Sequence, residues 1–444
     1  MKKRMISMLL AAAMVASLAV GCSGGGGTEE QGTAEGEKPA DGEKQKLIAM
    51  TWNDFSDAER IRDVMFEQFP ELEKKIEIEY ILAGSSNTDV AEKYRLSLAS
   101  DSYICDFMYF NGDDVAEFAY ADTLMELDDI YNADGIKDEI MPKALEVATY
   151  NDKLVAVPQE IKQTLWFYNK TMFDEAGIDP KEIKTTEQFI EAGKKFMEVF
   201  PDTAFFHGVP KAGYYMALNI MAHNNVVFKD EDGNYTIDSD PVIRKCLEDT
   251  YEILHSGINA EIQEWTPEWE SGFKDRVMAS TLTESYFKTF GSRLLEESED
   301  EWGVALWPGF GGEVSGMGAA GGLVMVIPKS AKNPELAKEW LQKCFLSKEG
   351  REVLHETSKL APIREDVFDE VVDKVDSDWG ETYNPATHEA VQLGGLPAFT
   401  ESSQYSKERT ILSEYVAKYL NDEIGLDEML TKCNQDLEQQ INKK

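Results

Sequence analysis

Aromatic side chains lie beside planar polar side chains at several positions of this 444-residue chain where loops are expected. Trp52 directly precedes Asn53, and Glu284 lies two residues before Tyr286. An aromatic ring can pack against the apolar C–H face of a saccharide, while carboxylate and amide groups bind the hydroxyl groups around its rim. The pattern is therefore typical of a carbohydrate site, although no single pair names a ligand.

Each of these rings could instead belong to a hydrophobic core. Polar loop neighbours favour a ligand-facing position for Trp52, Trp265 and Tyr286. Asp113 and Glu284 are equally consistent with a ligand contact and with a helix N-cap. Apolar neighbours favour the core for four other aromatic residues: Trp166, Phe167, Trp302 and Trp340.

No set of residues indicates catalysis, a metal ion or a cofactor. The 83 acidic residues give many chance pairs of carboxylates, which could cleave a glycosidic bond, but no motif selects one pair. The acidic turn at 230–234 is superficially similar to a calcium loop but lacks the later glutamate. The glycines at 318–322 precede a strand, so they do not form a phosphate-binding loop. We expect no enzymatic activity, no cofactor and no metal.

The segments that would position the polar and aromatic residues alternate between strand and helix. Residue patterns predict strands at 47–52, 76–82 and 105–110, with helices at 56–69 and 89–99 between them. This order indicates a parallel sheet covered by helices. Ligands bind beyond the carboxyl ends of such strands, which is where Trp52, Asn53, Asn111 and Asp113 stand.

Two lobes are expected, because the roughly 400 residues after the N-terminal segment exceed one compact core. Further strands are predicted at 165–168, 276–282 and 323–327, and a hairpin at 226–237. A long helix is predicted at 186–200, with Thr185 or Thr186 as its N-cap.

The first 46 residues have the pattern of a bacterial lipoprotein. Three cationic residues precede an apolar run at 5–20, and Gly21 and Cys22 follow. This predicts a signal peptide cleaved before a lipidated Cys22, with ordinary cleavage and free secretion as the alternative. Ala19 stands where such signals usually have Leu, which instead is found at Leu18. Residues 23–46 contain no aromatic or large aliphatic side chain and are expected to be a flexible tether.

The chain is strongly acidic, with a formal net charge of −39. A solvated acidic surface that repels nucleic acid and anionic lipid is the simplest interpretation. The cysteines after Cys22 show no metal-binding spacing, so buried small side chains are expected and disulfides stay open: Cys105, Cys246, Cys344 and Cys433. His207 follows two phenylalanines, which favours packing over a functional role.

Five longer motifs occur in the order found in one protein family. They are PQEIKQTLWFYNKTMFDEAGID (158–179), FKDEDGNYTIDS (228–239), FKDRVMASTLTESYF (273–287), WGVALWPG (302–309) and GLVMVIPKSAKNPELAKEWLQKCFLSKEGREVL (322–354). Behind a lipoprotein signal, they make residues 47–444 resemble bacterial extracellular solute-binding proteins of family 1, the group that contains maltose-binding protein.

The resemblance implies the two-lobe α/β fold of type II periplasmic-binding proteins, with a hinge and an interlobe cleft. The chain would cross between the lobes near 157–165, 302–308 and 329–333. The implied organisation has four parts: a signal peptide at 1–21, a lipidated Cys and flexible linker at 22–46, an N-terminal lobe of 47–157 plus 307–330, and a C-terminal lobe of 158–306 plus 331–444.

The implied function is that of a monomeric lipoprotein on the extracellular face of the cell membrane. It would capture a sugar, as an oligosaccharide, and deliver it to the transmembrane subunits of an ABC permease. The alternatives are a non-sugar solute, a sensing or adhesion role for the same fold, and, least favoured, cleavage of glycosides.

The resemblance also adds candidate site residues. Tyr286 falls where the family often has a stacking tryptophan, and Lys162 lies on the first crossing strand. Lys162 could meet an acidic sugar there, but we favour a pair with a nearby carboxylate. The expected ligand-binding residues are Trp52, Asn53, Phe110, Asn111, Asp113, Lys162, Tyr214, Trp265, Glu284, Tyr286, Trp307, Tyr405 and Arg409.

Overall fold

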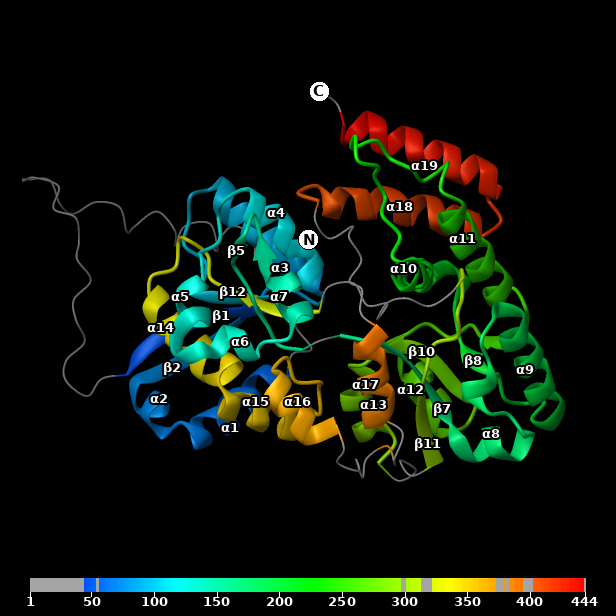
Figure 1. The fold of residues 1–444 in the computed structure, drawn as a ribbon, viewed down its shortest axis with the longest axis horizontal. Coiled ribbons are helices and arrows are strands. Elements are labelled where there is room, and N and C mark those ends of the chain that lie inside the picture. The colour runs from blue at the N-terminus through cyan, green and yellow to red at the C-terminus, as the bar shows by residue number, and fades with distance from the viewer. Residues whose placement is uncertain are drawn as a thin grey trace, which may run out of the picture. The chain divides into compact units, whose positions relative to one another are not determined.

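The computed structural model describes residues 44–52, 56–160, 162–296, 301–312, 322–372, 379, 383–393 and 402–442 (Figure 1). Residues 44–444 form one compact unit by their contacts. No helix within the described ranges is long and apolar enough to span a membrane. The predicted signal peptide, Cys22 and the tether up to residue 43 lie outside the described residues.

The first sheet has the strand order β2-β1-β3-β12-β6. Its strands are β1 (Gln45–Thr51), β2 (Ile76–Leu82), β3 (Phe107–Asn111), β6 (Val157–Pro158) and β12 (Leu323–Val326). β1 pairs in parallel with both β2 and β3, through the crossover helices α1 (Ser56–Gln68) and α3 (Asn87–Ala99), as predicted. β12 enters antiparallel between β3 and β6, a long-range pairing that the local pattern could not reveal.

Shorter elements complete this part of the molecule. They are α2 (Pro70–Lys75), α4 (Gly112–Tyr120), α5 (Asp128–Asn132), η1 (Ala133–Gly135), α6 (Ile136–Glu139), α7 (Pro142–Ala148), β4 (Thr149–Tyr150), β5 (Lys153–Leu154), α14 (Pro334–Leu341), the π-helical turn η5 (Gln342–Leu346), α15 (Lys348–Ser358) and α16 (Glu365–Val372).

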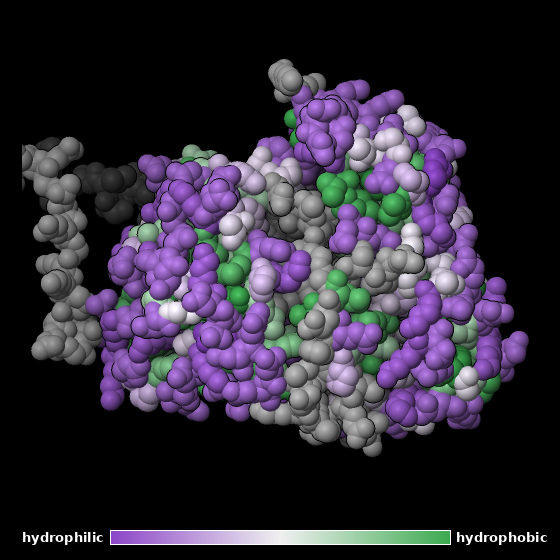
Figure 2. Space-filling model, viewed as in Figure 1, coloured by the Kyte–Doolittle hydropathy of each residue, from purple (hydrophilic) through white to green (hydrophobic). Residues whose placement is uncertain are grey.

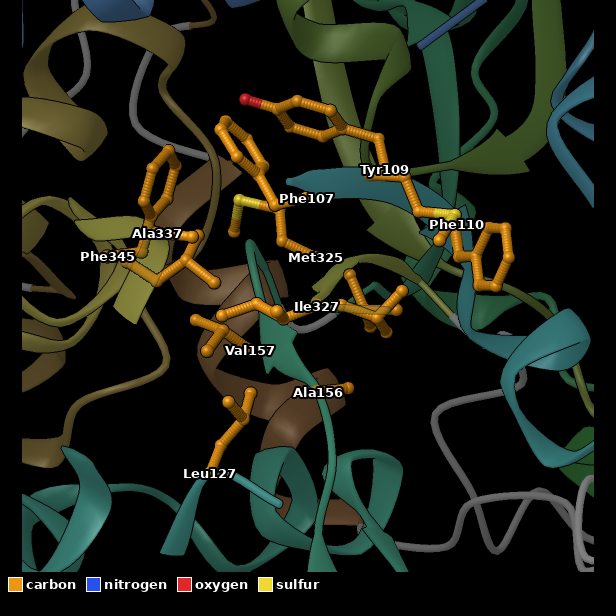
Figure 3. Packing of buried hydrophobic residues seen from close by; sticks show 14 of the residues in the cluster. Phe107, Tyr109, Phe110, Leu127, Ala156, Val157, Met325, Ile327, Ala337 and Phe345 are labelled. Atoms are coloured by element: carbon orange, nitrogen blue, oxygen red, sulfur yellow. The ribbon is translucent and has the colours of Figure 1, made fainter. Parts of the chain in front are cut away.

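The core of the first sheet draws on distant parts of the sequence. Figure 3 shows side chains of β3, β6, β12 and α14 gathered in it. Leu336, Trp340 and Phe345 are buried there, although the predicted partition put 331–444 in the C-terminal lobe. Trp307 and Phe310, predicted for the N-terminal lobe, instead pack in a core of the second sheet. An amphipathic pattern shows that a helix has a buried face, not which sheet it covers, so the sequence alone does not assign these segments to a core.

The second sheet has the strand order β11-β7-β10-β8-β9. Its strands are β7 (Thr164–Asn169), β8 (Phe206–His207), β9 (Asn259–Ala260), β10 (Ser280–Glu284) and β11 (Trp302–Leu306). Every residue of β7 is buried, and its side chains alternate between two hydrophobic clusters. Trp166 and Tyr168 face one cluster, whereas Leu165 and Phe167 face the other. The sheet is therefore covered on both faces, which confirms the core placement of Trp166 and Phe167, and Trp302 is buried as well.

Helices surround this second sheet. They are α8 (Lys170–Ala176), η2 (Pro180–Glu182), α9 (Thr186–Val199), η3 (Pro210–Ala212), α10 (Tyr214–His223), α11 (Pro241–Leu254), α12 (Pro267–Lys274), α13 (Phe287–Leu294), α17 (Tyr383–Leu393), α18 (Tyr405–Leu420) and α19 (Leu426–Gln440). Thr185 is the N-cap of α9, and it forms a capping box with Gln188.

Two local predictions differ from the structure. The expected hairpin at 226–237 is a turn closed by a single bridge between Lys229 and Tyr235. The strand predicted at 276–282 begins at Ser280 and continues to Glu284, because Arg276 adopts a positive φ of 57° in a turn. Much of the glycine-rich stretch, at 313–321, lies outside the described residues. The four cysteines after Cys22 are buried and free, as expected of small core side chains: Cys105, Cys246, Cys344 and Cys433.

Candidate ligand-binding site

The segment that leads from the first sheet to the second is anchored by a buried arginine. Residues 158–164 connect β6 to β7. Arg351, only 1% exposed on α15, donates hydrogen bonds to the backbone carbonyls of Pro158 and Gln159, the latter at 2.5 Å. Burial lowers the pKa of Arg351 to about 9. A buried guanidinium thus fixes the start of the crossing segment.

Lys162 and Glu284 form an ion pair directly after this anchor. The antiparallel register of β7 and β10 places Thr164 opposite Glu284, and Lys162 lies two residues before Thr164 on the same face. The side chains of Lys162 and Glu284 are 16% and 18% exposed. This confirms that Lys162 pairs with a carboxylate. Glu284 is the last residue of β10 and does not cap α13, whose N-cap is Tyr286.

A stacked pair of aromatic rings lies next to the ion pair. The rings of Trp265 and Tyr286 are 5.7 Å apart with an interplanar angle of 29°. Trp265 is 55% exposed, and Phe290 meets it edge-on at 5.4 Å. The Lys162 Nζ atom lies 5.9 Å from the centroid of the Tyr286 ring. These contacts bring four residues predicted to bind the ligand into one group: Lys162, Trp265, Glu284 and Tyr286.

The backbone holds Trp265 in an unfavourable conformation. Its φ of 61° is rare for a large side chain and costs on the order of 1–3 kcal/mol. A hydrogen bond at the neighbouring residue offsets part of this cost. Thr266 is the N-cap of α12, and its hydroxyl accepts a hydrogen bond from Trp269 N at 3.2 Å. A large, exposed and strained aromatic residue is a common mark of a functional site.

Tyr215, rather than Tyr214, presents an exposed ring near this pair. Tyr214 is buried, whereas Tyr215 is 64% exposed and its charge contributes to the raised pKa of Tyr286. The expected ligand-binding residues include Tyr214 but not Tyr215. Helical spacing could have separated them, because Tyr214, Ala217 and Leu218 form the apolar stripe of α10 and Tyr215 lies outside it.

Two further glutamates near the ion pair were also missed by sequence reasoning. Burial is the main cause that raises the pKa of Glu160 to about 7; the charge of Lys162 opposes the shift and that of Glu284 adds to it. The pKa of Glu264 is raised by burial and then by Glu284. The sequence carried no signal for either residue, because each shift depends on long-range packing.

Nothing in the structure tests the remaining predicted site residues as ligand contacts. Trp307 donates its indole N–H to the Leu165 carbonyl at 2.9 Å inside a core. Phe110 and Tyr405 are fully buried, and Arg409 lies 6.0 Å from the Tyr405 ring. Trp52 is partly buried against the first core, and Asn111 ends β3 and precedes α4. Asn53 and the side chain of Asp113 lie outside the described residues, so for these two no contact is stated.

The residues suspected of other roles have structural explanations. His207 is buried, and its Nε2 donates to the Ile262 carbonyl at 2.8 Å, as the packing interpretation expected. Asp230 accepts hydrogen bonds from the backbone N–H groups of Asp232 and Asn234, which closes the acidic turn. Within the described part of the chain, no cluster of His, Cys, Asp or Glu could hold a metal ion.

Two surface cavities occur in the described part of the chain, and the lining of the second includes Gln263, two residues before Trp265. One, of about 450 Å³, is lined by residues 224–242, and the other, of about 460 Å³, by residues that include Val209, His255 and Asp422. Neither contains an exposed aromatic ring beside a charged pair, so we place the candidate site at Trp265 and Tyr286 instead. Figure 2 shows hydrophilic residues over most of the described surface in this view, in keeping with the acidic composition.

Comparison with known proteins identifies the class. The family model of bacterial extracellular solute-binding proteins matches residues 65–381, so the chain belongs to that family. An arabinooligosaccharide-binding protein of Halalkalibacterium halodurans is 26% identical over 255 residues, which cover 54% of this chain and 55% of that protein. The chain thus spans about half the length of the curated relatives it matches.

Solved structures show the same fold over a longer span. The GacH receptor of Streptomyces glaucescens matches with a TM-score of 0.73 and 17% identity, over 89% of this chain and 98% of that one. A binding protein of B. animalis subsp. lactis, in complex with beta-1,6-galactobiose, matches with a TM-score of 0.70 and 19% identity, over 89% and 97%. The fold is therefore the two-lobe α/β fold of solute-binding proteins, as expected.

Proposed function

We propose that this protein is the solute-binding component of an ABC importer and that it captures an oligosaccharide without changing it. The observation that carries the proposal is the exposed, stacked Trp265 and Tyr286 pair beside the Lys162–Glu284 ion pair. The family membership and the oligosaccharides named for its relatives support it.

The geometry suggests how a sugar would be held. The exposed face of Trp265 would pack against sugar C–H groups, and Lys162 and Glu284 would bind hydroxyl groups as donor and acceptor. Binding would favour a closed form only through contacts that are better in that form. The anchored segment 158–164 would then serve as one strand of the hinge, and the closed protein would dock on the transmembrane subunits of the importer.

We also propose that Cys22 carries the lipid that holds the protein on the outer face of the cell membrane, as a monomer. Metabolic labelling with a fatty-acid analogue tests the anchor, because the full chain should be labelled and the Cys22→Ser variant should not. Equal labelling of both proteins would contradict this part of the proposal.

Isothermal titration calorimetry of the purified full chain tests the binding function. The titrants are arabinooligosaccharides, maltose and β-1,6-galactobiose, with amino acids and short peptides as non-sugar probes. At least one saccharide should bind, and Trp265→Ala should weaken its binding at least tenfold. Val199→Ala, which changes an exposed apolar residue at the end of α9, serves as the control and should bind normally.

The outcomes separate the alternatives. Binding of amino acids or peptides alone would overturn the sugar assignment but leave a solute-binding role. The saccharide recovered after prolonged incubation should be intact, with no new reducing ends. New reducing ends would instead favour a glycoside-cleaving enzyme.

A further inference from the structure

Several carboxyl groups lie near the aromatic pair. Glu284 raises the pKa of both Glu160 and Glu264, and Lys162 forms an ion pair with Glu284. Lys288 is buried on the adjoining α13 and has an interaction of its own there. The ion pair is neutral as a whole, so the charge balance depends on the other two glutamates.

Glu264 faces a histidine that cannot neutralise it. The Glu264 Oε1 atom lies 3.6 Å from His207 Nδ1. His207 Nε2 faces the Ile262 carbonyl at 2.8 Å, and a carbonyl only accepts, so Nε2 carries the proton. Burial lowers the pKa of His207, which keeps the ring neutral with an unprotonated Nδ1. Two hydrogen-bond acceptors therefore face each other. The Glu264 side chain is 40% exposed and acts on the pKa of Tyr286, so its carboxylate can interact with a donor from outside next to the aromatic pair.

Glu160 provides a second, independent observation. Its side chain is 7% exposed, and its Oε2 atom has no hydrogen-bond partner within the described part of the chain. Lys162, Glu284 and Ser285 all act on the pKa of this carboxyl group, so it lies close to the ion pair. A buried oxygen without a partner is costly, and a donor from a bound molecule would relieve that cost.

We propose that the site takes saccharides that carry a protonated amino group and rejects saccharides that carry a carboxylate. This inference rests on the proposed sugar-binding function and specifies its substrate class. The ammonium group would sit beside the Trp265 ring and pair with Glu264. A uronate would meet Glu264 with a like charge, and such repulsion is an effective source of specificity.

Calorimetry with matched sugars tests the inference on the full chain at about pH 6. The electron-withdrawing oxygens of a sugar lower the pKa of its amine to about that of an α-amino group, roughly 8 or less, so the measurement is made below that value. The probes are glucose and glucosamine, galactose and galactosamine, cellobiose and the β-1,4-linked glucosamine disaccharide, and digalacturonate. At least one amino sugar should bind tenfold or more tightly than its neutral partner, and digalacturonate should not bind. Because the contact is ionic, the preference should fall severalfold when NaCl rises from about 50 to about 500 mM.

Glu264→Gln should remove the preference for the amino sugar, whereas Glu261→Gln, an exposed glutamate three residues earlier, should retain it. Neutral sugars that bind as tightly as their amino partners, or a preference that salt does not weaken, would overturn the inference while the proposed function stood. If no sugar of any kind binds, including those of the wider panel, both fall. The salt titration needs no variant, so it decides the matter even where Glu264→Gln fails to fold.

Discussion

The ion pairing and the pKa values of the ionisable residues in the crossing segment depend on the neighbours that folding brings to them. Lys162 and Glu160 are two residues apart, yet Lys162 gains a carboxylate partner whereas Glu160 is buried with one oxygen unsatisfied. The pairing of Lys162 could be predicted because acidic residues are abundant. The raised pKa of Glu160 could not, since it follows from burial that the sequence does not display.

Glu160 should make the protein less stable as the pH rises. Its pKa is about 7 when folded against an ordinary value of 4.5, so both states are protonated below about pH 4.5. Above that, the unfolded state loses its proton first, and stability falls until the pH passes about 7. The full loss is about 3 kcal/mol, from 1.36 kcal/mol per pKa unit.

Urea unfolding at about pH 5 and about pH 8 measures this effect. The natural chain should lose stability between the two pH values, and the Glu160→Gln variant should lose much less. Glu67→Gln, at an exposed glutamate on α1, should lose as much stability as the natural chain. An unchanged pH dependence in Glu160→Gln would show that the carboxyl group is not held as described.

At the level of helices and strands, local sequence patterns predict the elements themselves but not which distant elements pair with one another. The first three strands and their helices follow from apolar periodicity within short windows, and Thr185 was named as a possible N-cap. The antiparallel insertion of β12 and the packing of α14 on the first sheet join residues that are far apart in sequence. Strand and helix patterns indicate burial but carry no information on the partner.

Loss of the α9 cap should cost about 1 kcal/mol of unfolding free energy. Thr185 Oγ1 accepts a hydrogen bond from Gln188 N at 3.3 Å, and Gln188 Oε1 accepts one from Thr185 N at 3.2 Å. Thr185→Ala removes the first bond, and chemical denaturation should report the loss. Thr410→Ala, an exposed site within α18, is the control and should be neutral or slightly stabilising, because alanine favours helix. Equal effects of the two changes would contradict the capping role.

Loss of the Arg351 anchor should lower the free energy of unfolding more than loss of the α9 cap does. Arg351→Ala leaves the carbonyls of Pro158 and Gln159 without their donor and opens a cavity, so it should cost about 2–4 kcal/mol. Arg351→Lys should recover part of this, since one ammonium can reach one carbonyl. Arg60→Ala removes an exposed arginine–carbonyl bond to Thr357 and should cost less than about 1 kcal/mol. Circular dichroism during chemical unfolding measures both losses. If Arg351→Ala lowered the free energy of unfolding as little as Arg60→Ala does, the anchoring role would be contradicted.

At the scale of the whole molecule, two sheets with separate cores are joined by a chain that passes between them more than once. β7 continues directly from the anchored segment, and β12 returns to the first sheet after β11 has paired in the second. The site residues at the end of β10 and before α12 adjoin this connection. A ligand held there touches residues close to the hinge, which is how binding could favour one arrangement of the lobes.

The crystal structure of the protein with the saccharide that binds best in calorimetry tests the central claim most directly. A sugar ring should pack on Trp265 and Tyr286, with polar groups of the sugar within hydrogen-bond distance of Lys162 or Glu284. A sugar bound in either of the two surface cavities, with the Trp265 ring still open to solvent, would contradict it.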